Sequence, residues 1–120
     1  MPKKSNAEIG KIAENVVFAY LKKHGSKPVR AAGNKGYDIK AGRTYYEVKG
    51  TEQSFDELHY FNLTRTEYRA AMDNKFYWIC WVSIKDKKPI FIPRDYILKN
   101  VHKNEMYWLY LSKYKKQVKR

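Results

Sequence analysis

Acidic residues are scarce in this sequence: 12 Asp and Glu stand against 25 Lys and Arg, so the 120 residues carry a formal net charge of +13. So large a positive excess favours a polyanionic partner, with nucleic acid as the first candidate and an anionic membrane surface as the second. Cysteine is almost absent as well. The single Cys80 excludes an internal disulfide, and its place in the apolar stretch 77–81 predicts a buried, reduced thiol in an intracellular, cytoplasmic protein.

Several functional classes lack their sequence signatures here. No apolar run approaches the roughly 18 residues of a membrane helix, and no hydrophobic region follows the basic residues near the N-terminus, so we expect neither a membrane partner nor a signal peptide. The three histidines, His24, His59 and His102, do not have the spacing of zinc ligands. A glycine-rich phosphate loop and a G-x-S-x-G elbow are also missing, and we expect no small-molecule cofactor.

The sequence does contain enough apolar and aromatic residues for one folded domain. Hydrophobic residues make up 43% of the chain and aromatic residues 16%, whereas disordered chains lack that aromatic content. We therefore predict a single domain over 1–120, in which 85–112 forms a β/α/β appendage and 113–120 a basic tail.

Hydrophobic periodicity and turn residues predict the order of the elements. Helices are expected at 6–24, 64–73 and 94–101; strands at 27–32, 37–40, 43–49, 76–84, 89–93 and 105–111; and a loop at 52–63. The pairs Ser5–Glu8 and Thr64–Glu67 have the spacing of capping boxes, which gives both acids a structural explanation. The strand 76–84 is apolar enough to be central, and prolines bracket 89–93 as an edge strand. The fold class is therefore α/β, with an αβββαβ core and a mixed central sheet flanked by helices.

Two of the remaining acids fall on neighbouring predicted strands. Side chains alternate along a strand, so Glu47 and Lys49 share a face, and a hairpin turn at 41–43 places Asp38 near the Glu47 end of the partner strand. Carboxylates that converge repel each other unless they hold a cation, and oxygen ligands of this kind suit Mg²⁺ or Mn²⁺. The structural alternative is that Asp38 is a turn residue and that Glu47 and Lys49 form a solvated ion pair of little energetic value.

The strings 36–39 (Gly-Tyr-Asp-Ile) and 46–51 (Tyr-Glu-Val-Lys-Gly-Thr) resemble the signature of the PD-(D/E)XK nuclease superfamily, which has an Asp on one strand and Glu-x-Lys on the next. With 62–67 included, the sequence looks like the C-terminal domain of NO VEIN-type proteins, and it is similar in size and layout to archaeal Holliday-junction resolvases. The resemblance covers about residues 5–84. It implies a restriction-endonuclease-like fold and a Mg²⁺- or Mn²⁺-dependent deoxyribonuclease that hydrolyses phosphodiester bonds in DNA, with junction-resolving, structure-specific cleavage as the subclass.

The resemblance also implies roles for individual residues. Asp38 and Glu47 would bind the metal ion together with the carbonyl oxygen of Val48, and Lys49 would orient the attacking water or stabilise charge on the phosphate. Glu14 matches the place where many members of the superfamily have a glutamate on the first helix that points into the metal site. The alternative for Glu14 is an ordinary charge beside the buried stripe of that helix.

Basic and polar side chains around the loops are expected to contact the sugar–phosphate backbone, which positions nucleic acid without reading its sequence. These residues are Lys11, Lys35, Arg43, Thr51, Gln53, Arg65 and Arg69. Cleavage of both strands of a junction needs two active sites, so we expect a homodimer, with residues 104–112 or the edge strand at 90–92 as its interface. Two other hypotheses remain open: a nucleic-acid-binding module that keeps the fold without the chemistry, and a basic membrane-surface or RNA-binding protein with an incidental motif.

Overall fold

The computed structural model describes residues 4–33, 35–103, 107–111 and 114. The predicted basic tail lies outside these residues except for Tyr114, and so do residues 104–106 and 112 of the segment 104–112 that is proposed above as a dimer interface. No helix within the described part of the chain is long and apolar enough to cross a membrane.

A mixed five-stranded sheet forms the centre of the fold, as predicted. Its strands lie in the order β1 (Pro28–Arg30), β2 (Ile39–Ala41), β3 (Thr44–Thr51), β5 (Tyr77–Ser83) and β6 (Lys88–Pro93). Only β3 and β5 pair in parallel, and the other neighbours are antiparallel. The hairpin of β2 and β3, the inner position of β5 and the edge position of β6 are confirmed.

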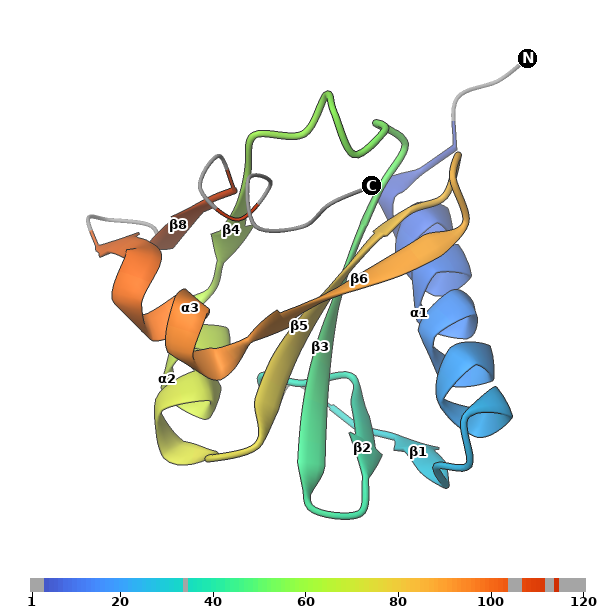
Figure 1. Cartoon of the computed structure of the whole chain (residues 1–120), viewed down its shortest axis with the longest axis horizontal. Helices are drawn as coiled ribbons and strands as arrows, with labels where there is room; N and C mark the ends of the chain where they lie inside the picture. Colours follow the sequence, from blue (N-terminus) through green and yellow to red (C-terminus); the bar gives the residue numbers. More distant parts are fainter. Residues whose placement is uncertain (1–3, 34, 104–106, 112–113, 115–120) are drawn as a thin grey trace.

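Helix α1 (Asn6–Lys23) covers one face of this sheet (Figure 1). The predicted capping box is present, since the Ser5 side chain accepts the Glu8 N–H and the Glu8 side chain accepts the Ser5 N–H. Ala13 and Val17 bury the predicted stripe of the helix against a cluster that includes Cys80, whose thiol is buried as predicted. Burial of Cys80 raises the pKa of that thiol well above its usual value, so the group is neutral.

Helices α2 (Arg65–Asp73) and α3 (Arg94–Asn100) lie on the opposite side of the sheet from α1 (Figure 1). They bury Ala71 and Ile97 in a second cluster with the β5 side chains of Ile79 and Trp81. Arg94 joins the two helices, because its guanidinium donates to the carbonyl oxygens of Ala71 and Met72, at 2.6 and 2.9 Å, near the end of α2. The core is therefore two apolar layers with the sheet between them.

A small second sheet was not predicted. It consists of β4 (Tyr60–Leu63), β8 (Tyr107–Tyr110) and β7 (Val101–Lys103), in that order. The prediction of a loop over 52–63 is wrong at its end, because β4 pairs with β8, a strand far away along the chain, and local sequence carries no signal of that pairing. The segment 85–112 is shared between the sheets, since β6 belongs to the main sheet and β7 and β8 to the small one.

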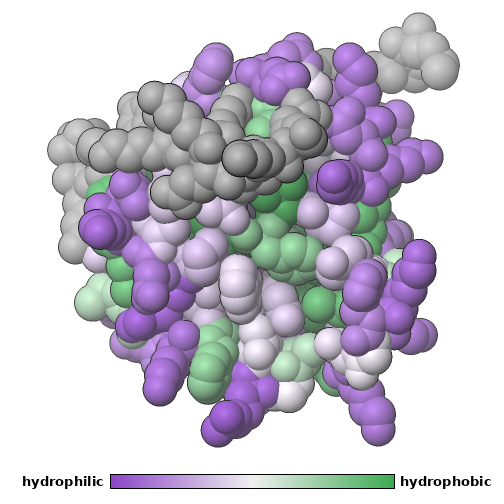
Figure 2. All heavy atoms as spheres, viewed as in Figure 1, coloured by the Kyte–Doolittle hydropathy of each residue, from purple (hydrophilic) through white to green (hydrophobic). Residues whose placement is uncertain are grey.

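The surface in the view of Figure 2 is mostly hydrophilic at its margins. Hydrophilic side chains gather along the right margin, over α1, and along the lower margin, around β1 and β2, while paler and apolar residues lie between them.

Candidate active site

Asp38 stands immediately before β2, opposite Glu47 of β3 in the antiparallel register. Its backbone N–H donates to the Tyr46 carbonyl oxygen at 2.8 Å, which continues the ladder by one step. The Asp38 carboxylate oxygen Oδ2 accepts a hydrogen bond from the next β3 donor on that side, the Val48 N–H, at 2.7 Å. The N–H and C=O of one strand residue point to the same edge, so the Val48 carbonyl lies on the Asp38 side of β3 as well.

Glu47 and Lys49 lie on the face of β3 that looks toward α2, as the alternation of the strand predicts. The Glu47 side chain is buried, with 7% of its surface exposed, and the Lys49 ammonium lies 3.6 Å from its Oε2. The alternative of a solvated surface ion pair is wrong for this reason. A buried acid paired at long distance with one lysine is a poor structural ion pair, because the loss of hydration exceeds the attraction.

A third carboxylate, Glu67, enters the site from the first turn of α2. Its Oε1 accepts a hydrogen bond from the Lys49 ammonium at 2.7 Å and another from the Thr64 N–H at 3.0 Å. The capping box predicted for Thr64 and Glu67 is therefore confirmed, but the sequence analysis stopped there and missed the contact with Lys49. One signal was available: Glu67 precedes the buried Ala70 and Ala71 by three and four residues, the spacing that places side chains on one helix face.

Gly36 explains how the Asp38 segment reaches α2. It has a positive φ of 82°, and a Cβ built on it would lie 2.6 Å from the Thr66 carbonyl oxygen and 2.7 Å from the Ala70 Cβ. The Gly36 carbonyl accepts a hydrogen bond from the buried hydroxyl of Tyr77 on β5, at 2.8 Å. A larger residue would push the loop away from the helix, so this glycine sets the separation between Asp38 and Glu67.

Burial and mutual repulsion shift the pKa values of the acids. Burial, followed by the charges of Glu67 and Asp38, raises the pKa of Glu47 to about 10. Burial is also the main reason that the pKa of Asp38 is raised, and the charge of Glu14 adds to it. For Glu67 burial acts upward, but the Lys49 ammonium and the hydrogen bonds it receives outweigh burial and lower its pKa. Without a cation, Glu47 therefore holds a proton and Glu67 the negative charge that balances Lys49.

The donor set fits a hard divalent cation in its chemistry. Asp38, Glu47 and the Val48 carbonyl supply oxygen atoms, the ligands that Mg²⁺ and Mn²⁺ prefer. Within the described residues, no three Asp, Glu, His or Cys side chains already stand in the arrangement of a metal cage. Burial first, and the charges of Glu67 and Asp38 second, raise the pKa of Glu47, and a bound cation would favour its ionised form.

Glu14 lies outside this cluster. Its carboxylate forms an ion pair with Arg30 of β1 at 2.5 Å, and Arg30 also donates to the Asn15 side chain at 2.7 Å. In this structure Glu14 is therefore a charge at the margin of the helix, paired with Arg30. The charge of Glu14 nevertheless contributes to the raised pKa of Asp38, so the two carboxylates are electrostatic neighbours.

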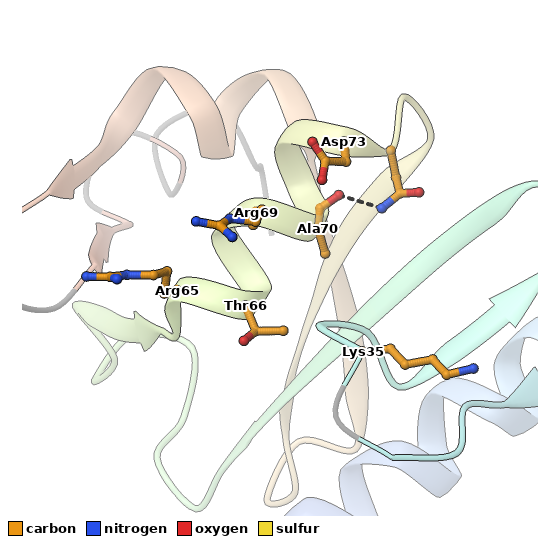
Figure 3. Close-up of a pocket in the computed structure, with 7 residues that line it drawn as sticks. Lys35, Arg65, Thr66, Arg69, Ala70 and Asp73 are labelled. Carbon is orange, nitrogen blue, oxygen red and sulfur yellow. Dashed lines mark hydrogen bonds between the residues drawn. The ribbon is translucent and has the colours of Figure 1, made fainter.

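The predicted nucleic-acid contacts are only partly brought together. Lys35, Arg65 and Arg69 line a hollow of about 340 Å³ beside α2 (Figure 3). In this view Arg65 and Arg69, one helical turn apart, project to the same side, and Lys35 projects away from them. The other four lie apart from this hollow: Lys11 on α1, Arg43 in the β2–β3 hairpin, Thr51 at the end of β3 and Gln53 just beyond it.

Two of these residues have structural contacts of their own. The Arg43 guanidinium lies over the Phe76 ring, 5.1 Å from its centroid. The Thr51 hydroxyl accepts the Gln53 N–H at 3.0 Å and so shapes the turn that leaves β3. Lys11 is exposed on the helix that covers the opposite face of the sheet from Glu47.

Comparisons with known proteins bear on the family and the fold of the chain. The family model described as "Protein NO VEIN, C-terminal" matches residues 9–94. A search of the curated proteins finds no match. Among solved structures, the chain is similar to Hjc of Archaeoglobus fulgidus, a Holliday junction resolvase from an archaeal hyperthermophile. The TM-score is 0.61 at 21% sequence identity, over 88% of this chain and 87% of that one. The resolvase fold and the predicted identification with the PD-(D/E)XK nucleases are thereby confirmed.

Proposed function

Since the chain belongs to the NO VEIN C-terminal family, we propose that it is a metal-dependent endonuclease that hydrolyses phosphodiester bonds in DNA, with preference for branched substrates. The observation that carries the proposal is the convergence of Asp38, Glu47 and Lys49 on one face of the sheet. The resolvase fold supports the same reaction class, and the net charge of +13 supports a polyanionic substrate.

Asp38, Glu47 and the Val48 carbonyl would hold Mg²⁺ or Mn²⁺. Such an ion, when bound, supplies Lewis-acid polarisation of the scissile phosphate and a more acidic water. The Val48 N–H orients Asp38 for this task. It donates a hydrogen bond to one carboxylate oxygen, and the other oxygen would bind the cation. Glu14 would complete the ligands by exchanging Arg30 for the cation, as its electrostatic contact with Asp38 permits.

Lys49 would place a positive charge beside the reacting phosphate and orient the attacking water. Its ammonium is a compact charge with three donors, of which Glu67 accepts one at 2.7 Å. Because Glu67 is itself held by the Thr64 N–H at the start of α2, the lysine is anchored to a helix rather than to a flexible loop. Glu67 thus acts as a positioning residue for Lys49.

DNA would approach the open side of this cluster. Lys35, Arg65 and Arg69 beside α2, with Lys11, Arg43, Thr51 and Gln53 elsewhere, would contact sugar and phosphate rather than bases. The fold shared with a Holliday junction resolvase favours recognition of DNA shape over recognition of sequence. Two cuts in a junction require two such sites, so we propose a homodimer as the active form.

A cleavage panel tests the proposal. Linear, nicked, flapped and four-way DNA are incubated with and without Mn²⁺, and the expected result is metal-dependent cleavage with the four-way substrate cut fastest. Asp38→Ala and Glu47→Ala should abolish cleavage. Glu52→Ala is the matched control, because it removes one exposed carboxylate just beyond β3 and should cut like the wild type. Equal cleavage by all three variants would contradict the assignment.

A non-catalytic nucleic-acid-binding module is the alternative. The contact of Lys49 with Glu67 favours it, since a lysine whose charge is balanced by a neighbour is already satisfied without substrate. This alternative predicts salt-sensitive DNA binding without turnover on any substrate of the panel.

A further inference from the structure

A second hollow, of about 560 Å³, lies beside the first two strands of the sheet. We call it the β1–β2 groove; it is lined by Lys27, Val29, Arg30, Lys35, Tyr37 and Lys40, with small residues between them. Its described lining contains four cations and no acid. None of the residues that line it, apart from Lys35, lines the hollow beside α2.

Three of the four cations are available to a ligand. Arg30 is engaged by Glu14 and Asn15, whereas none of the ion pairs found among the described residues includes Lys27, Lys35 or Lys40. Lys35 projects away from the arginines of α2 (Figure 3). Three unpaired ammonium groups around one concave surface attract an anion with several charges.

Lys40 of the groove contacts the strand that carries Glu47. Lys40 is paired with Tyr45 in the β2–β3 register, and its ammonium lies over that ring, 5.2 Å from the centroid. Tyr45 precedes Glu47 by two residues on the same face of β3, a distance of about 7 Å. The neighbouring Tyr37 ring, 4.7 Å from that of Tyr45 between centroids, belongs to the residue just before Asp38. The contacting rings of Tyr37 and Tyr45 therefore connect the lining of the groove with the two segments that carry the acids.

The groove also offers apolar contact, which a binding site for a small inorganic anion would not need. Val29 is 66% exposed, the largest exposure among the large hydrophobic residues of the described chain, and it faces the groove opposite Lys40 in the β1–β2 register. Lysines beside aromatic and apolar side chains are the combination that binds a nucleic-acid strand, with ammonium groups on the phosphates and rings against sugars and bases.

We infer that the β1–β2 groove binds the sugar–phosphate backbone of the cleaved strand, about two nucleotides to one side of the phosphate that Asp38 and Glu47 face. This inference rests on the proposed function for the position of the scissile phosphate. It assigns Lys27 and Lys40 as positioning contacts, and it leaves Arg65 and Arg69 to hold the substrate on the other side of the loop that carries Lys35.

Binding without turnover tests the groove. The affinity of the full chain for a fluorescein-labelled four-way DNA junction is measured by anisotropy in EDTA over a series of NaCl concentrations. The double variant Lys27→Gln/Lys40→Gln should bind roughly 10- to 100-fold more weakly at about 100 mM salt, and the slope of log K against log salt should fall by about 2. The matched control, Lys22→Gln/Lys23→Gln, removes the same charge from the exposed end of α1 and should change the affinity less than about threefold.

Each outcome decides one point. Equal losses of affinity in the two double variants, or no loss in either, would contradict DNA binding in the groove. A wild type that does not bind the junction would contradict it as well. A wild type that binds with the predicted difference between variants but cuts nothing in Mn²⁺ supports the groove and overturns the nuclease proposal. A wild type that cuts while both double variants bind equally well supports the nuclease and overturns the groove.

Discussion

The two faces of strand β3 differ although they alternate residue by residue. On the side of α1, Val48 packs among apolar side chains, and Gly50 lies so close to the helix that a Cβ would stand 2.7 Å from the Ala13 Cβ. On the side of α2, Glu47 and Lys49 are drawn out of water beside Glu67. The α1 face is tightly packed against the helix. The α2 face brings charged side chains together, which packing of the fold does not require.

Under the proposed function, this difference assigns Val48 and Gly50 of the Glu-Val-Lys-Gly string to packing through their α1 side, and Glu47 and Lys49 to the chemistry. Buried acids with raised pKa values weaken a fold, and they persist where a function requires them. Substitutions on the α2 face should therefore remove activity and leave the fold intact, and substitutions on the α1 face should do the reverse.

The largest expected effect is the loss of activity in Glu47→Gln. The amide keeps the shape of the side chain but cannot carry the charge that a cation needs, so kcat/KM for the four-way junction should fall about 1,000-fold or more. Single-turnover cleavage in Mn²⁺ measures the change. A loss of less than about tenfold would mean that Glu47 is not in the reacting centre.

Gly50→Ala tests the packing on the α1 face of β3. The new methyl would meet the Ala13 Cβ at 2.7 Å and the Ile9 carbonyl oxygen at 3.0 Å, and two elements of the core would have to separate. We expect a loss of about 3 kcal/mol in the free energy of unfolding, measured by urea titration. Gly10→Ala is the control: its Cβ meets nothing within 4 Å in the middle of α1, so it should stabilise the protein by roughly 1 kcal/mol.

Substitutions at Glu67 and Thr64 separate the two contacts of Glu67. Both Thr64→Ala and Glu67→Ala break the capping box, at about 1 kcal/mol of stability. Only Glu67→Ala also frees Lys49, so it should lower kcat roughly 10- to 100-fold with little change in KM, while Thr64→Ala keeps kcat within about threefold. Glu67→Gln retains an oxygen for both contacts and should restore most of kcat. Equal kcat values in the two alanine variants would mean that Glu67 only caps α2 and does not position Lys49.

Glu47→Gln should also stabilise the metal-free protein. Folded Glu47 holds its proton up to a pKa of about 10, whereas in the unfolded chain it loses the proton near its ordinary value of 4.5. Between these pH values the unfolded state binds fewer protons, so wild-type stability falls as pH rises, and glutamine removes that dependence. In EDTA we expect the variant to melt about 5 °C above wild type at pH 8, with a smaller difference at pH 5. A difference that does not grow with pH would contradict the raised pKa.

A change in stability without a direct change in the site is expected from Tyr77→Phe. This change removes the hydroxyl that donates to the Gly36 carbonyl at 2.8 Å and leaves that carbonyl without its buried donor. Stability should fall by about 1 to 2 kcal/mol in a urea titration. Tyr20→Phe, at an exposed ring on α1, should change it by less than about 0.5 kcal/mol. Equal effects would mean that the Gly36 contact does not anchor the loop.

The parts of the fold that could be predicted are those with a strong local pattern. The stripe and cap of α1, the apolar run of β5 and the prolines around β6 each identify one element from its own residues. Strand β4 could not be found in this way, because its four residues become a strand only through pairing with β8.

The site shows the same limit in its chemistry. Strand alternation is enough to put Glu47 beside Lys49, and the hairpin is enough to put Asp38 opposite Glu47. The role of Glu67 depends on the docking of α2 against the loop at Gly36, a tertiary contact with no local signature. The capping box already gave Glu67 a structural explanation, so the capping pattern offered no reason to look for its contact with Lys49.

The most direct test of the central claim is a crystal of the protein soaked in Mn²⁺ and measured for anomalous scattering. The account predicts a single strong peak on the α2 face of β3, within bonding distance of Asp38, Glu47 and the Val48 carbonyl. A crystal saturated with Mn²⁺ that has no peak there, or whose strongest peak lies at exposed acids elsewhere, would contradict it.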